Sequence, residues 1–173
     1  MESENSLIIA TAITELAKDA ARSIRDVIFK YIKDESAKAE IDYGDAFEQY
    51  LKTASEKNSK LKTLIYRHEP KDLEAIYECV GVSLGTHNID TRSIHNLLEV
   101  GHKIIITGTG GVGKSTLIKH LFLNTIVETA FIPILVELRG INSIDTGKIE
   151  LEDLICLSLK NYGMTMKKEY FCL

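Results

Sequence analysis

The sequence predicts an α/β protein in which an N-terminal helical segment precedes an incomplete parallel β-sheet. Three features predict this fold class: a helix-periodic N-terminal stretch, two short and almost wholly apolar segments typical of buried parallel strands, and a glycine-rich loop between the first of these segments and a helix. The chain has 173 residues, 45% of them hydrophobic, and two prolines. This composition is typical of a globular protein and not of a disordered one.

The N-terminal part is predicted to be helical. Apolar residues recur every three or four positions from about Asn5 to Ala39, which predicts an amphipathic helix. A break is predicted at Asp42–Gly44, after which the same spacing from Tyr43 to Ala54 predicts a second helix that packs against the first. The stretches KLKTLIYRHEP and AIYECVGVSL fit strand and helix equally, so we expect connectors with short strands there.

The C-terminal part alternates helices with apolar strands. In chain order we expect a loop at Gly85–Asp90, a helix at Ser93–Val100 capped by Ser93, a buried strand at Lys103–Thr107, a helix at Ser115–Val127, a second strand at Phe131–Leu138, a loop at Gly140–Gly147, a helix at Glu150–Asn161 that Gly163 ends, and the start of another helix at Met164–Leu173. We therefore divide the chain into an N-terminal helical module (1–42), a helical lead-in and connector (43–92) and a domain built around the glycine loop (93–173).

The loop GTGGVGKST carries the chemistry. It satisfies the P-loop (Walker A) pattern of a glycine, four residues, then Gly-Lys-Ser/Thr, and it lies between a predicted strand and a predicted helix. Its glycines let the backbone approach an anion closely with its N–H groups pointing inward. The residues predicted to bind a nucleoside triphosphate are Gly108, Thr109, Gly110, Gly111, Val112, Gly113, Lys114, Ser115 and Thr116.

Three positions of the loop have distinct expected roles. Lys114 should reach the β- and γ-phosphates as a point charge, and the Ser115 hydroxyl should ligate a Mg²⁺ ion that bridges them. Thr116 should touch the α-phosphate or cap the turn, and the start of the following helix adds a positive dipole end. These expectations make MgATP the predicted ligand.

Two other nucleotide motifs overlap this region. GTGGVG also spells the dinucleotide fingerprint GxGxxG, with Glu137 near the place of a ribose-binding acid, but Lys114-Ser115 directly after the last glycine favours a triphosphate site. A GTPase would need a base-reading Asn-Lys-x-Asp, and Asn142–Asp145 lacks the lysine and comes too soon after the loop.

Three stretches together resemble NACHT-type NTPases of the signal-transducing STAND class, especially bacterial ones. IIITGTGGVGKSTLIKHL is similar to their Walker A region, FIPILVELRGIN to their second strand, and AFEQYLKTASEKNSKLKTLIYRHEP to their lead-in. The resemblance spans roughly Phe47 to the C-terminus. It implies a P-loop NTPase fold, ATP binding with slow or no hydrolysis, nucleotide-controlled signalling, and a role in defence against phage.

The hydrolytic part of such a domain is not predicted in this chain. A Walker B strand, which ends in an acid that holds Mg²⁺ and orients water, does not follow the loop, so no catalytic residue is identified and enzymatic activity is left open. Glu137 fits a Walker B acid superficially, but by the resemblance its segment is the second strand. Because that strand and the P-loop strand are separated by later strands in the family, both would lack neighbours here. We therefore expect a fragment of a longer protein.

Composition also bears on the possible partners of the protein and on its localisation. Net charge is −4 with scattered lysines and arginines, which indicates neither a nucleic-acid nor a membrane partner. Cys79, Cys156 and Cys172 show no disulfide or zinc spacing, and the acidic start MESENS does not resemble a secretory signal, so a cytoplasmic protein is predicted. Two alternatives stay open: an interaction module made by the N-terminal helices, through partner binding or self-association, with a non-functional loop remnant, and a conventional P-loop kinase or NTPase.

Overall fold

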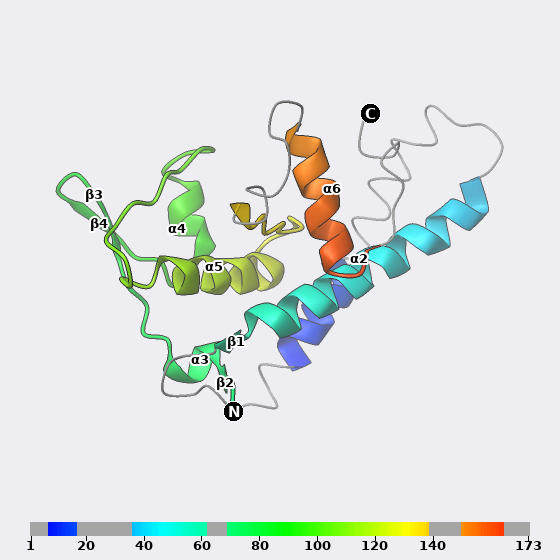
Figure 1. Cartoon of the computed structure of the whole chain (residues 1–173), viewed down its shortest axis with the longest axis horizontal. Helices are drawn as coiled ribbons and strands as arrows, with labels where there is room; N and C mark the ends of the chain where they lie inside the picture. The colour runs from blue at the N-terminus through cyan, green and yellow to red at the C-terminus, as the bar shows by residue number, and fades with distance from the viewer. Residues whose placement is uncertain (1–6, 17–35, 62–68, 139–149, 165–173) are drawn as a thin grey trace. The chain divides into compact units, whose positions relative to one another are not determined.

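The computed structural model describes residues 7–16, 36–61, 69–138 and 150–164. In these ranges the chain is a mixture of helices and small antiparallel sheets (Figure 1). It forms two compact units that interleave along the sequence, the first from 1–9 and 55–131, and the second from 10–54 and 132–173. Among the described residues, no helix is long and apolar enough to cross a membrane.

The second unit is helical. It contains most of the helix at residues 7–16, the greater part of α2 (Ser36–Asn58) and α6 (Leu151–Asn161). Tyr50 of α2 and Tyr162 after α6 meet edge to face, with ring centroids 5.9 Å apart and planes at 88°. The side chains buried around them come from all of these segments and include Ile13, Leu16, Phe47, Leu51, Ala54, Cys156, Leu159 and Met164. Burying these apolar stripes stabilises helices whose intrinsic propensity is modest.

The ends of α6 follow local rules. At its start the Glu150 N–H donates to Asp153 Oδ2 at 3.3 Å, and at its end Gly163 takes a positive φ of 87°. Reversal of the chain there lets the Met164 N–H donate to the Leu159 carbonyl at 3.0 Å. The predicted helix and its glycine terminator are confirmed.

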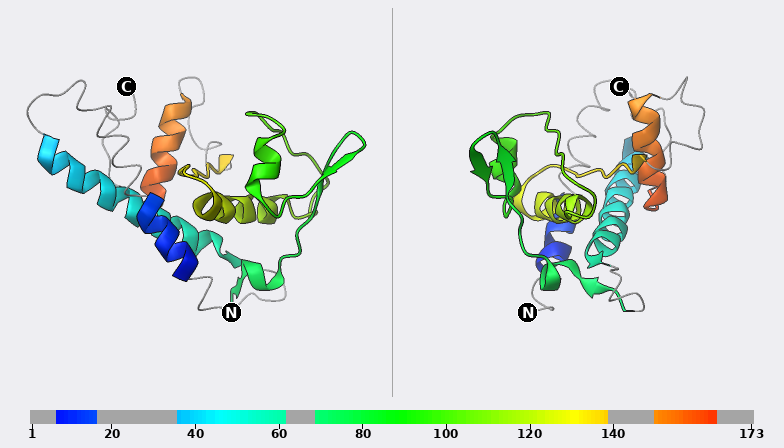
Figure 2. Two further views of the ribbon diagram at one scale, coloured as in Figure 1. Left: turned by 180° about the vertical axis from the view of Figure 1, so that it is seen from behind. Right: turned by 60° about the vertical axis from the view of Figure 1, so that its left-hand side comes forward.

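In its described residues, the first unit combines two short sheets with three helices and the end of α2. In chain order it contains β1 (Lys60–Leu61), β2 (Lys71–Asp72), α3 (Leu73–Ile76), β3 (Val82–Leu84), β4 (His87–Ile89), α4 (Ile94–Leu98) and α5 (Lys114–Glu128). β1 pairs antiparallel with β2, and β3 with β4. The views in Figures 1 and 2 both place α4 beside α5. Leu97 of α4 and Leu117 and Leu121 of α5 form the buried centre of this contact, against which Val82, Ile89, Ile94 and Ile106 pack.

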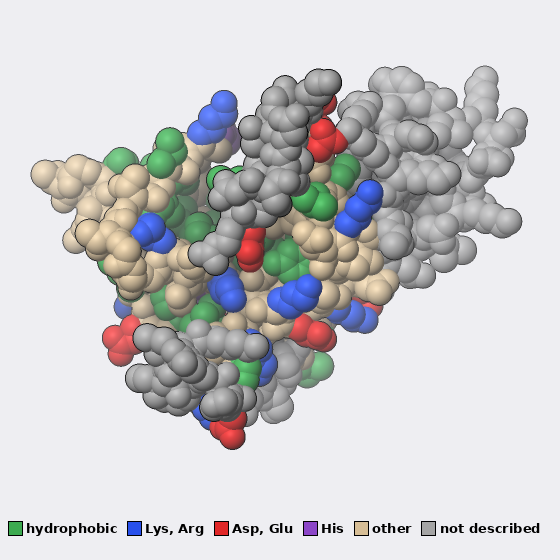
Figure 3. All heavy atoms as spheres, viewed as in Figure 1, with side chains coloured by type: hydrophobic (Ala, Val, Ile, Leu, Met, Phe, Trp, Pro, Cys, Tyr) green, Lys and Arg blue, Asp and Glu red, His purple; other side chains and the backbone are tan. Residues whose placement is uncertain are grey.

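The parallel sheet predicted from the sequence is not present in the described residues. Lys103–Thr107 and 131–137 form neither helix nor strand, and both sheets are two-stranded and antiparallel. Apolar side chains of these segments reach the surface: Ile105 is 90% exposed and Phe131 is 65% exposed. Hydrophobic side chains are visible among the surface residues in Figure 3. A parallel strand needs hydrogen-bonding neighbours, and the described residues provide none for either segment.

Two further expectations change and one is confirmed. The predicted break at Asp42–Gly44 is wrong, because α2 runs through Gly44 without interruption. The predicted loop at Gly85–Asp90 contains strand β4, because Gly85 (φ 61°) turns the chain back onto β3. The Ser93 cap is confirmed, since its hydroxyl accepts from the His95 N–H at 3.3 Å. The predictions for 17–35, 140–147 and 165–173 lie outside the described residues.

Candidate phosphate-binding loop

The glycine loop lies in the first unit and leads directly into α5. Gly113 precedes the helix in a left-handed conformation, and the first intrahelical hydrogen bond joins the Leu117 N–H to the Gly113 carbonyl at 2.8 Å. The N–H groups of Lys114, Ser115 and Thr116 precede that bond and have no acceptor within the helix. They point out of the helix start, where the helix dipole favours an anion.

Two glycines of the loop adopt conformations that side chains disfavour. Gly111 has φ 81° and Gly113 has φ 95°. Gly108 is tight for a different reason, because a Cβ there would lie 3.0 Å from Val112 Cγ1 and the Val112 side chain would have to shift. Gly110 has no positive φ, and a Cβ there would meet no atom within 4 Å. The sequence pattern predicted a tight loop, and the backbone shows which glycines make it tight.

The Lys114 ammonium is held by the loop itself. Its Nζ donates to the Gly108 carbonyl at 2.7 Å and to the Thr109 carbonyl at 2.8 Å. An ammonium has three N–H donors, so one is left for an external acceptor. The positive charge is thereby fixed close to the start of α5, where it adds to the helix dipole.

The last two residues of the loop border a cavity. Ser115 is exposed and Thr116 is half-buried, and both line a cavity of about 630 Å³. Three lysines, Lys57, Lys60 and Lys119, line the same cavity and were not among the predicted site residues. Lys119 could have been found from its spacing, because it follows Ser115 by four positions on a helix. Lys57 and Lys60 could not, since only the fold brings the end of α2 and β1 to α5.

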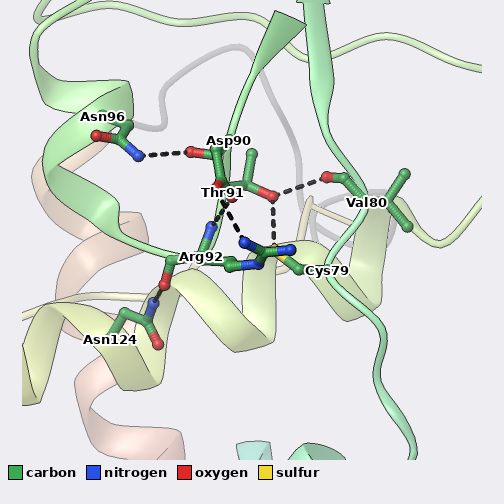
Figure 4. A network of polar contacts seen from close by, with 7 residues as sticks. All are labelled: Cys79, Val80, Asp90, Thr91, Arg92, Asn96 and Asn124. Atoms are coloured by element: carbon green, nitrogen blue, oxygen red, sulfur yellow. Dashed lines mark hydrogen bonds and ion pairs between the residues drawn. The ribbon is translucent and has the colours of Figure 1, made fainter.

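A polar network holds the segment before α4 against α5. Thr91, which is completely buried, donates from its hydroxyl to the Val80 carbonyl at 2.7 Å and lies 3.1 Å from Cys79 Sγ (Figure 4). The Asn124 side-chain amide on α5 donates to the Arg92 carbonyl, as Figure 4 also shows. A buried polar group that is satisfied in this way, as Thr91 is, favours one arrangement of the backbone. The network thus sets the position of the helix that carries the loop.

Among the described residues, none of the remaining candidates lines the cavity. Glu137 is exposed, forms no strand and belongs to the second unit. The described residues contain no group of three or more His, Cys, Asp or Glu side chains that could hold a metal ion. Cys79 and Cys156 are free thiols, while Asn142–Asp145 and Cys172 lie outside the described residues.

Comparison with known proteins identifies no relative. No protein-family model, no curated protein and no solved structure matches the chain. Function is therefore inferred from the loop and from the residues around it.

Proposed function

We propose that this chain binds a nucleoside triphosphate, MgATP, with the phosphates on the loop Gly108–Thr116. The observation that supports this most is the conformation of the loop: two glycines with positive φ turn the chain into the start of a 15-residue helix, beside a lysine ammonium anchored on the loop. A loop of this kind concentrates backbone N–H groups and positive charge at one point. A polyphosphate is the ligand that such a point binds best.

Each loop residue has a part in this proposal. The N–H groups ahead of Leu117 donate to phosphate oxygens, and Lys114 uses its remaining N–H donor on the β- and γ-phosphates. Thr116, half-buried at the cavity edge, contacts the α-phosphate side. Mutual repulsion of the phosphate charges is thereby balanced by protein donors.

The Ser115 hydroxyl suits the magnesium ion of the nucleotide. It is a hard oxygen ligand at the second position of α5 and is exposed toward solvent. Mg²⁺ is usually bound by few protein oxygens together with phosphates and water, so a site without a carboxylate cluster fits an ion that arrives with the nucleotide. No described residue is assigned to water activation, and hydrolysis is not part of the proposal.

The resemblance to NACHT-type proteins extends the proposal from binding to regulation. We infer a signalling module in a defence system, in which the nucleotide controls the state of the protein and the N-terminal helices contact partners. Leu7 and Ile8, which are 68% and 52% exposed, offer apolar side chains for such a contact. Nucleotide binding is the part that can be tested first on this chain.

The test is equilibrium binding of MgATP by titration calorimetry to the full chain and to Lys114→Ala. Removing a charged hydrogen-bond donor should weaken binding by at least about tenfold. Lys160→Ala, an exposed lysine on α6 in the second unit, is the matched control and should bind normally. Equal affinity in the chain and in Lys114→Ala would sink the assignment. No binding by the unsubstituted chain at millimolar ATP would favour the alternative of a helical interaction module with a passive loop.

A further inference from the structure

The cavity beside the loop is large enough for more than phosphates. Its volume of about 630 Å³ falls within the range of roughly 300–1,000 Å³ found for small-molecule sites. All the described residues that line it belong to the first unit. The end of α2, β1 and Pro70 form one side, and the first turns of α5 form the other.

The cavity is continuous with the loop. Ser115 and Thr116 are the last residues of the P-loop pattern and are also part of the cavity wall. Lys119 follows them by one helical turn, on the same side of α5. A ligand whose phosphates rest on the loop can therefore extend along α5 into the cavity.

The chemistry of the wall is mixed. Of the described lining residues, Lys57, Lys60 and Lys119 provide three ammonium groups and Glu56 provides one carboxylate. Two of these lysines are held in place, because Lys119 Nζ donates to the Lys60 carbonyl at 3.4 Å and the Lys60 ammonium forms an ion pair with Asp72. Leu61 and Pro70 add an apolar surface next to these charges. Such a wall suits a ligand that is anionic at one end and has a flat, apolar body.

We propose that this cavity binds the ribose and base of the nucleotide whose phosphates rest on the loop. Leu61 and Pro70 contact the base, and Lys119 adds positive charge on the α-phosphate side. The inference rests on the proposed function, since it needs phosphates on the loop, but it goes further by assigning nucleoside recognition to the end of α2, β1 and Pro70.

The test compares two ligands of the full chain: MgATP, and magnesium tripolyphosphate, which has the phosphates without the nucleoside. Pro70→Trp places a large side chain at the cavity wall and should weaken MgATP binding by about tenfold or more while changing tripolyphosphate binding by less than about twofold. Thr86→Trp, in the β3–β4 turn away from the cavity lining, is the matched bulky control and should change neither. Leu61→Ala, which changes the side-chain volume less, should also weaken MgATP binding more than tripolyphosphate binding.

The outcomes separate the two proposals. If neither ligand binds the unsubstituted chain, the phosphate site itself is wrong. If both bind and Pro70→Trp and Leu61→Ala weaken them equally, or weaken neither, phosphate binding stands and the nucleoside cavity is refuted. Far-ultraviolet circular dichroism and a denaturant midpoint for each variant show that the comparison is made between folded chains.

Discussion

The Ser93 hydroxyl donates a hydrogen bond of 2.6 Å to Glu128 Oε2, which joins the start of α4 to the end of α5. The same carboxylate oxygen accepts the Ile94 N–H at 3.2 Å. A negative charge at the C-terminus of α5 is unfavourable for that helix, but at the N-terminus of α4 it is favourable. Glu128 therefore stabilises the packing of α4 against α5 and destabilises the C-terminus of α5.

This relationship predicts coupled losses of stability. Ser93→Ala should cost about 1 kcal/mol and Glu128→Ala about 1–2 kcal/mol of unfolding free energy, because each leaves an N–H donor of α4 without its acceptor. In the double variant the cost should be less than the sum, which a double-mutant cycle in urea measures. Additive losses would show that the two side chains act independently. Glu99→Ala, an exposed acid after α4, is the control and should change little.

The glycines of the loop predict an unequal tolerance to alanine. Gly113→Ala should cost about 1–2 kcal/mol of stability, because an L-residue is strained at φ 95°. Gly110→Ala should be neutral or slightly stabilising, since its φ is not positive and its Cβ would meet no atom within 4 Å. Denaturant midpoints of the two variants provide the comparison. Equal costs would contradict the loop conformation described above.

Ser115 predicts a magnesium-dependent loss of binding. If its hydroxyl ligates the ion, Ser115→Ala should weaken MgATP binding by about tenfold and reduce the gain in affinity that Mg²⁺ gives over ATP with chelator. Ser115→Thr keeps a hydroxyl and should restore the magnesium effect. ATP titrations with and without Mg²⁺ measure the gain in affinity that the ion gives. If this gain is unchanged in Ser115→Ala, the hydroxyl is not a ligand of the ion.

Tyr50 predicts a pH dependence in the second unit. It is completely buried, and its hydroxyl donates to the Pro133 carbonyl at 2.7 Å. Burial raises the pKa of the Tyr50 phenol well above its ordinary value, and the neighbouring Tyr162 raises it further. The folded state therefore keeps its proton at a pH where the unfolded chain, with a tyrosine pKa of about 10, loses it. Stability from this group is full below pH ~10 and falls above it by up to about 1.4 kcal/mol per pH unit.

The measurement is the difference in unfolding free energy between the chain and Tyr50→Phe across pH 8 to about 11.5. At pH 8 the variant should be less stable by about 1 kcal/mol or more, because the Pro133 carbonyl loses its donor. Above pH 10 that difference should shrink, since phenylalanine does not ionise. Tyrosines that do not interact with Tyr50 cancel in the difference, so a value that stays constant with pH would contradict the assignment.

Local signals allowed the helices to be predicted from the sequence. Ser93 as a cap, Gly163 as a terminator and the apolar spacing of α5 and α6 act over one or two helical turns, and the structure confirms them. The predicted break near Gly44 fails because one glycine costs only about 1 kcal/mol in a helix, which burial of Phe47, Tyr50 and Leu51 outweighs. The parallel sheet was predicted from two short apolar segments and from the glycine loop that follows the first of them. Composition describes what a strand would bury and not which neighbour it would pair with.

For the candidate site, the sequence by itself determined the loop, because a P-loop pattern is a contiguous stretch whose glycines and lysine have fixed spacing. Only the tertiary structure decided what surrounds it. Lys57, Lys60, Leu61 and Pro70 lie more than forty residues before Ser115 in the chain and line one cavity with it. Contacts over such separations depend on how the end of α2 and the β1–β2 pair pack near α5, which no local pattern encodes.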